Sequence, residues 1–180
     1  MRIFIALELP DKTRENLARS VAQMKNFATK GNFAPTENYH VTLHFLGEVA
    51  EHDLIYVQSA MDKISNLAAP ECALAQFAVL RGNGIICAKL RQNGALTELH
   101  DRLGEQLELN RFDVEHRAYR PHVTVLRNFA FELPFSEVTK SVDVYNKPFL
   151  ATEVVLYQSV LSQSGATYRE LYRVSLKKPE

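Results

Sequence analysis

Two short segments of the chain follow the same alternation of polar and apolar residues, which limits how both can fold. Residues 40–43 read His-Val-Thr-Leu, and residues 122–125 read His-Val-Thr-Val. An alternation with a period of two predicts a half-buried β-strand, in which positions i and i+2 point to the same face. Each segment therefore places a histidine and a threonine side by side on one face, with apolar side chains on the other.

The repetition of this pattern carries more weight than either copy. A single strand histidine is most simply a structural residue with a satisfied hydrogen bond. Two full copies are not expected by chance in a chain with only 6 histidines. We therefore interpret His40 with Thr42, and His122 with Thr124, as two halves of one functional site.

Hydrophobic periodicity predicts a mixture of strands and helices along the rest of the chain. Strands are expected at 2–9, 39–46, 71–80, 84–90, 122–127, 141–146, 149–161 and 167–176. Helices are expected at 11–27, from Asp53 to the Ala69–Pro70 stop, and from Asn93 through the leucine stripe that ends at Leu107. Loops are expected at 31–38 and 111–121, irregular chain at 131–135, and tight turns at 81–84 and 164–165.

The order of these elements indicates the fold class. The chain has no glycine-rich nucleotide loop and no regular strand–helix–strand alternation. This favours an α+β fold with antiparallel sheet and helices on its outer faces. Each half contains a helix, a loop and then a His-x-Thr strand, and no linker rich in Pro, Gly or Ser separates the halves. We therefore expect residues 1–180 to form one domain made of two similar lobes.

The overall composition restricts partners and compartment. The chain has 21 basic and 21 acidic residues, so its net charge cannot hold a long nucleic acid, and any phosphate recognition must be local. No apolar run approaches the ~20 residues of a membrane span, and residues 1–10 lack the features of a signal peptide. We expect a cytoplasmic protein without membrane contact, and a monomer is the default expectation. Cys72 and Cys87 lack metal or redox spacing.

The two pairs suit acid–base chemistry on a phosphoryl group. Histidine titrates near neutral pH, so one ring can accept a proton while the other donates one. Threonine hydroxyls on both sides can donate hydrogen bonds to anionic oxygens held between them. Arg127 follows the second pair and can add charge-assisted hydrogen bonds, but simple alternation places it on the face opposite His122. A bend or bulge in that strand would bring it into the site.

A metal site is the competing interpretation. His40 and His44 share a face under simple alternation, but on a strand they would lie roughly 13 Å apart, too far for one ion. No cysteine cluster or nearby pair of carboxylates completes a ligand set. We expect no metal and no cofactor.

Four segments resemble one known family. Residues 38–48 and 121–127 resemble the two motif blocks of the two-histidine phosphoesterase superfamily, and within it the LigT-like RNA 2′,3′-cyclic phosphodiesterases. The opening residues 2–10 and the closing segment from Leu156 to Tyr168 are also similar to that family. The resemblance spans essentially the whole chain. It is specific for the superfamily and less specific for one substrate.

The resemblance implies a bilobal fold, with a cleft between two antiparallel sheets, and a metal-independent reaction. That reaction hydrolyses the 2′,3′-cyclic phosphate of an RNA end or small nucleotide to a 2′-phosphomonoester. By position, His40 is implied as the general acid that protonates the departing 3′ oxygen, and His122 as the general base that activates water. Thr42, Thr124 and Arg127 are implied to hold the phosphate oxygens.

Some points stay open at the level of sequence. His44 stands where the family more often has a small or apolar residue, and it can line the cleft without taking part in the chemistry. Phe45 or Tyr119 can stack on a terminal base. The alternatives in function are a 2′-5′ RNA ligase, an esterase for another cyclic phosphate, and a nucleotide- or RNA-binding module without turnover.

Overall fold

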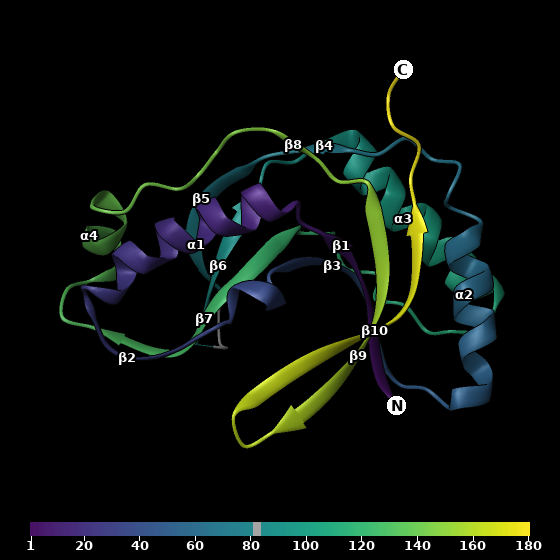
Figure 1. The fold of residues 1–180 in the computed structure, drawn as a ribbon, viewed down its shortest axis with the longest axis horizontal. Helices are drawn as coiled ribbons and strands as arrows, with labels where there is room; N and C mark the ends of the chain where they lie inside the picture. Colours follow the sequence, from purple (N-terminus) through teal and green to yellow (C-terminus); the bar gives the residue numbers. More distant parts are fainter. Residues whose placement is uncertain (81–83) are drawn as a thin grey trace.

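The computed structural model describes residues 1–80 and 84–180 (Figure 1), and its described part is built around two four-stranded antiparallel sheets. The first sheet has the order β10 (Gly165–Ser175), β9 (Glu153–Ser162), β1 (Arg2–Glu8) and β3 (His40–Glu48). The second has the order β2 (Ala28–Phe33), β7 (His122–Phe131), β6 (Ile85–Leu90) and β5 (Leu74–Leu80). The strands β4 (Glu71–Cys72) and β8 (Phe149–Leu150) form a separate two-stranded sheet.

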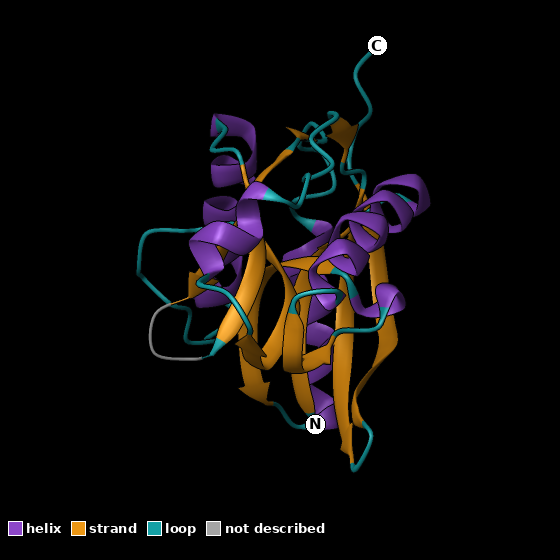
Figure 2. Cartoon of the chain, turned by 90° about the vertical axis from the view of Figure 1, so that its left-hand side faces the viewer, coloured by secondary structure: helices purple, strands orange, loops and turns teal. Residues whose placement is uncertain are grey.

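Helices lie on both sides of the molecule. They are α1 (Asp11–Lys25), α2 (Leu54–Asp62), α3 (Gly94–Leu109) and α4 (Phe135–Lys140), with 3₁₀ turns η1 (Thr36–Asn38) and η2 (Glu51–Asp53). Figure 1 shows α2 and α3 together beside β10, and α1 and α4 near the second sheet. In Figure 2 the helices flank the strands. None of the helices in the described ranges is both long and apolar enough to cross a membrane.

The strand β1 is the central element of the first sheet. It pairs with β3 on one side and β9 on the other, so both of its edges are occupied. Ile3, Ile5 and Leu7 have no exposed surface, which places one face of β1 in the hydrophobic core. Phe4 is also buried, on the face that lines the site described below. The strands β3 and β9, which carry other residues of the site, are positioned by their pairing with β1.

The α+β fold with antiparallel sheets is confirmed, and most predicted elements are present. Some predictions were wrong. The helix expected from Asp53 to the Ala69–Pro70 stop already ends at Asp62, as α2. The loop expected at 31–38 begins as the end of β2, which is not visible in the sequence because Ala-Thr-Lys-Gly-Asn-Phe lacks alternation and is a strand through its pairing with β7. The strand expected at 141–146 is irregular chain after the short helix α4, which the sequence prediction missed. Of the turn expected at 81–84, residues 81–83 lie outside the described residues.

A long hairpin of β9 and β10 projects from the first sheet (Figure 1). Its turn is Gln163–Ser164, one residue earlier than the predicted Ser164–Gly165. Gly165 follows at a φ of 118°, a conformation that favours glycine. The side-chain amide of Asn38 donates a hydrogen bond of 2.9 Å to the carbonyl oxygen of Ala166. This contact ties the arm of the hairpin to the residues that precede β3.

Candidate active site

A cavity of about 880 Å³ lies between the two sheets. Its lining comes from β1, β3 and the tip of the β9–β10 hairpin on one side, and from β2 and β7 on the other. His40, Thr42, Thr124 and Arg127 are all among the lining residues. The two motif strands, far apart in sequence, therefore contribute to one cavity.

His40 is held in a defined orientation at the start of β3. Its Nδ1 lies 2.7 Å from the carbonyl oxygen of Asn38, which can only accept, so Nδ1 carries a proton and donates it. Its Nε2 lies 3.0 Å from the hydroxyl oxygen of Thr42. In the neutral ring, Nε2 accepts a hydrogen bond from that hydroxyl. The Nε2 atom is therefore the atom available for proton transfer.

The surroundings of His40 keep its ring neutral. Phe4 lies 4.9 Å from the ring between centroids, and Tyr168 meets it edge-on at 5.2 Å. Burial lowers the pKa of His40 to about 4, against the opposing effect of the hydrogen bond to Asn38. The charges of His122 and Arg127 lower this pKa further.

His122 opens β7 with the same backbone contact. Its Nδ1 donates to the carbonyl oxygen of Arg120 at 2.8 Å, which again leaves Nε2 as the working atom. The ring is more exposed than that of His40 and is not among the cavity-lining residues. A positive charge on His122 nevertheless lowers the pKa of His40, so the two rings influence each other.

A β-bulge in β7 turns Arg127 toward the cavity. In the pairing of β7 with β6, Thr124 opposes Cys87 and Leu126 opposes Ile86, so Val125 is the extra residue. Val125 and Leu126 are both buried, and Arg127 is exposed and lines the cavity. The bulge that the sequence required for Arg127 to join the site is present.

A second bulge, in β3, places His44 on the opposite face from His40. In the pairing of β3 with β1, Thr42 opposes Ala6 and His44 opposes Ile5, so Leu43 is the extra residue. His44 is only 4% exposed and does not line the cavity. The expectation that it extends the cleft face was wrong, because alternation stops at the bulge. Phe45 takes the place on the cavity face instead.

His44 belongs to a buried stack of rings behind the first motif. Its ring stacks on His100 of α3 at 4.3 Å, and His100 stacks on Tyr119 at 4.0 Å. His44 Nε2 donates to the carbonyl oxygen of His100 at 2.8 Å. Burial lowers the pKa of His44 to about 4. The ring of His44 lies against Gly104, where an added Cβ would come within 3.1 Å of its Cε1 atom.

The hydroxyl of Tyr119 reaches from this stack to the site. It donates to the backbone carbonyl oxygen of Thr42 at 2.9 Å. Tyr119 does not line the cavity, so it is not placed to stack on a base as the sequence allowed. Sequence reasoning also missed Phe4, Asn38 and Tyr168, because nothing in their local pattern marks them as neighbours of His40.

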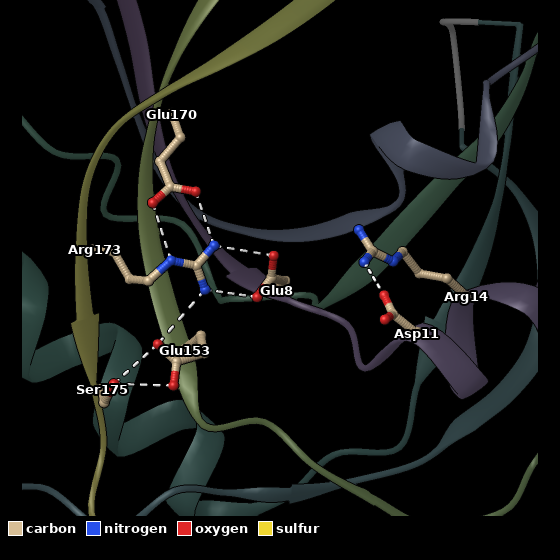
Figure 3. A network of polar contacts seen from close by, with 7 residues as sticks. All are labelled: Glu8, Asp11, Arg14, Glu153, Glu170, Arg173 and Ser175. Carbon is tan, nitrogen blue, oxygen red and sulfur yellow. Dashed lines mark hydrogen bonds and ion pairs between the residues drawn. The ribbon is translucent and has the colours of Figure 1, made fainter.

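The charge on the cavity wall is positive. Arg2 and Arg127 are the charged residues in the lining, and within residues 1–80 and 84–180 no carboxylate lines it. A group of ion pairs sits at the other end of β1 (Figure 3). There Arg173 contacts Glu8 at 2.7 Å, Glu170 at 2.8 Å and Glu153 at 3.6 Å, which joins β10, β9 and β1. These carboxylates neutralise Arg173 away from the cavity.

The described residues include no group of three or more His, Cys, Asp or Glu side chains arranged to hold a metal ion. His40 and His44 point to opposite faces of β3, so they cannot bind one ion together. Cys72 and Cys87 are both free and buried.

Comparison with known proteins finds similar sequences and the same fold. The family model described as LigT like Phosphoesterase matches residues 7–87, which include the first His-x-Thr segment. The structure of Escherichia coli LigT complexed with 3′-AMP superposes with a TM-score of 0.80 at 24% identity, covering 97% of each chain. The chain is therefore similar to the LigT-like phosphoesterases over residues 7–87, and it has the fold of LigT over nearly its whole length. The structure of TT0787 from Thermus thermophilus has the same fold, with a TM-score of 0.80 at 23% identity and full coverage of both chains.

Two curated proteins that match most of the chain carry the same name. The protein of Methanocaldococcus jannaschii is 28% identical over 93% of this chain and 96% of its own length, and is named RNA 2′,3′-cyclic phosphodiesterase. The Geobacillus stearothermophilus protein of the same name is 25% identical over 89% of this chain. The match covers 53% of the Geobacillus protein, so the chain spans about half the length of that relative.

Proposed function

We propose that this LigT-like chain hydrolyses the 2′,3′-cyclic phosphate of an RNA end or small nucleotide to a 2′-phosphomonoester, without a metal ion. The observation that carries the proposal is the matched pair of histidines. Each has its Nδ1 bonded to the carbonyl oxygen two residues earlier, and each is followed two residues later by a cavity-lining threonine. The name of the curated relatives supports the substrate.

The roles follow from where protons must move. His122, as the general base, takes a proton from water as the water oxygen attacks phosphorus. His40, as the general acid, gives a proton to the 3′ oxygen as the P–O3′ bond breaks. Thr42, Thr124 and Arg127 bind the phosphate oxygens, on which negative charge grows in the transition state. Proton exchange with solvent then restores both histidines.

The neutral state of His40 in the free protein fits this scheme when the substrate is an anion. A pKa of about 4 leaves the ring unprotonated at neutral pH. The cyclic phosphate carries a negative charge, and an opposite charge next to Nε2 favours the protonated ring. Binding of the substrate would therefore raise the pKa of His40. The ring would then be protonated and could donate this proton to the leaving 3′ oxygen. The neutral ring before binding also avoids a buried, unpaired charge.

The test is an assay with chelator on a nucleoside 2′,3′-cyclic phosphate and on an RNA oligonucleotide that ends in one. The reaction is run in ¹⁸O-labelled water, and the phosphomonoester is identified by its position and its mass. A 2′-phosphate with one ¹⁸O is expected. A 3′-phosphate would reverse the regiochemistry, and the absence of turnover on both substrates would contradict the proposal.

A further inference from the structure

The two halves of the site differ at one equivalent position. Arg127 and Phe45 each stand five residues after the histidine of their motif, and a bulge brings each to the cavity. The second motif therefore presents a cation at this position, and the first presents an aromatic ring.

The aromatic position carries a cation from another strand. The guanidinium carbon of Arg2 lies 5.0 Å from the centroid of the Phe45 ring. Arg2 is exposed and lines the cavity, and in the described part of the chain it forms no ion pair. The neighbouring carboxylate of Glu48 is instead 3.3 Å from the amino group of Met1. The stacked guanidinium thus keeps its hydrogen-bond donors for a ligand.

This cation is separated from the reacting phosphate. Phe45 is three residues beyond Thr42 on β3, a distance of roughly 10 Å along the strand. The stacking holds the guanidinium beside Phe45, on the far side of this stretch of β3 from Thr42. The cavity lining has no carboxylate among the described residues. The cavity has a volume of about 880 Å³, at the upper end of the 300–1,000 Å³ usual for small-ligand sites.

We infer that Arg2, stacked on Phe45, binds a second phosphate of the substrate, the phosphodiester on the 5′ side of the nucleotide that carries the cyclic phosphate. A guanidinium suits this group because its planar donors match two phosphate oxygens. The Phe45 ring is 52% exposed, so it also offers apolar surface for the adjoining base. The substrate class is then an oligonucleotide end in preference to a mononucleotide. This inference rests on the proposed function.

The first test compares three substrates: a nucleoside 2′,3′-cyclic phosphate, a dinucleotide with the same terminus, and the same dinucleotide with a neutral methylphosphonate linkage. The unmodified dinucleotide is expected to have the highest kcat/KM, with a gain of roughly 10-fold to 100-fold for a charge-assisted contact. The methylphosphonate should lose most of that gain. A methylphosphonate as good as the phosphodiester would overturn the inference.

The variant Arg2→Gln removes the charge and keeps a polar side chain. It should reduce the gain of the dinucleotide over the mononucleotide to less than about threefold, and it should not distinguish the phosphodiester from the methylphosphonate. Arg169→Gln is the matched control, because Arg169 is an exposed cation on β10 that does not line the cavity. The inference would be overturned if Arg2→Gln kept the wild-type ratio of kcat/KM between dinucleotide and mononucleotide. It would also be overturned if the variant lost kcat/KM equally on all three substrates.

A binding measurement separates this subsite from the reaction. A dinucleotide that ends in a 2′-deoxy 3′-phosphate cannot be hydrolysed by this route, and calorimetry can compare its Kd with that of its methylphosphonate analogue. Tighter binding of the phosphodiester, lost in Arg2→Gln, supports the subsite even if no turnover is found. If the mononucleotide is hydrolysed but the dinucleotide and its methylphosphonate analogue bind with equal Kd values, the proposed function remains intact and the subsite is rejected.

Discussion

The hydroxyl of Tyr119 donates a 2.9 Å hydrogen bond to the backbone carbonyl oxygen of Thr42, and this bond joins the two halves of the site. Tyr119 lies three residues before His122, and Thr42 lies two residues after His40. The phenol ring is fixed from behind by its stacking on His100. Burial raises the pKa of Tyr119 well above its usual range, so the hydroxyl stays protonated and remains a donor.

Tyr119→Phe is expected to lower kcat by about 3-fold to 10-fold and to change KM less. The ring and its stacking remain, but the spacing of the two histidines is no longer fixed, and proton transfer depends strongly on geometry. The lost bond should reduce the free energy of unfolding by about 1 kcal/mol. Kinetics on a cyclic phosphate and urea unfolding measure both effects.

Tyr56→Phe is the matched control for Tyr119, because Tyr56 is exposed on α2, away from the cavity. It should leave kcat and stability unchanged. A Tyr119→Phe variant with the kcat of the wild type and a normal loss of stability would show that the bond is only structural.

His40→Ala and His122→Ala should each reduce kcat by about 10²-fold to 10⁴-fold, the usual contribution of a general acid or base. Both proteins should remain folded, because His122 is only half-buried and His40 borders the cavity. Steady-state kinetics with circular dichroism as a folding check measure this. Wild-type turnover in either variant would remove that histidine from the mechanism.

A sulfur-bridged substrate separates the acid from the base. In a 2′,3′-cyclic phosphate with sulfur in place of the 3′ oxygen, the thiolate leaving group departs without a proton. His40→Ala is expected to recover most of its lost rate on this substrate, while His122→Ala is not. The opposite pattern would exchange the two roles.

The stability of the protein should fall as the pH decreases from about 6.5 toward 4, partly because of His44. Its pKa is about 4 in the folded protein, against an ordinary value of 6.5, so the unfolded chain binds more protons in this interval. At pH 5 the loss from this one group is roughly 1–2 kcal/mol. His40 has the same direction of shift and adds to the effect.

Urea unfolding of the wild type and of His44→Phe at pH 7.5 and pH 5.0 isolates the contribution of His44. The variant should be less stable at pH 7.5, because the carbonyl of His100 loses its donor. Its further loss at pH 5.0 should be smaller than that of the wild type. Equal losses in the two proteins would show that His44 is not the titrating group.

Gly104→Ala should destabilise the protein, although alanine in a helix is normally favoured over glycine by about 0.5–1 kcal/mol. The added Cβ would lie 3.1 Å from Cε1 of His44, whose ring is held by its hydrogen bond and its stacking on His100. In the background of His44→Ala the same change should be stabilising. Thermal unfolding of the four proteins gives the coupling energy, and an absence of coupling would contradict this contact.

The sequence by itself determined both His-x-Thr pairs and the antiparallel α+β fold. Alternation is a local property, so it identifies His40 with Thr42, and His122 with Thr124, before any tertiary contact is known. The leucine stripe of α3 and the cap at Asn93 are local in the same way. The side chain of Asn93 accepts from the backbone N–H of Leu96, as a capping residue does.

Only the tertiary structure decided which residues share the cavity. The bulges that turn Arg127 toward the cavity and His44 away from it into the protein interior depend on register against β6 and β1. Register with a partner strand is not encoded in alternation. The strand β2 exists through its pairing with β7. The bond from Tyr119 to Thr42, and the stacking of Arg2 on Phe45, join residues on different segments. Such contacts form only once the sheets are packed, because no periodicity along one segment specifies its neighbour.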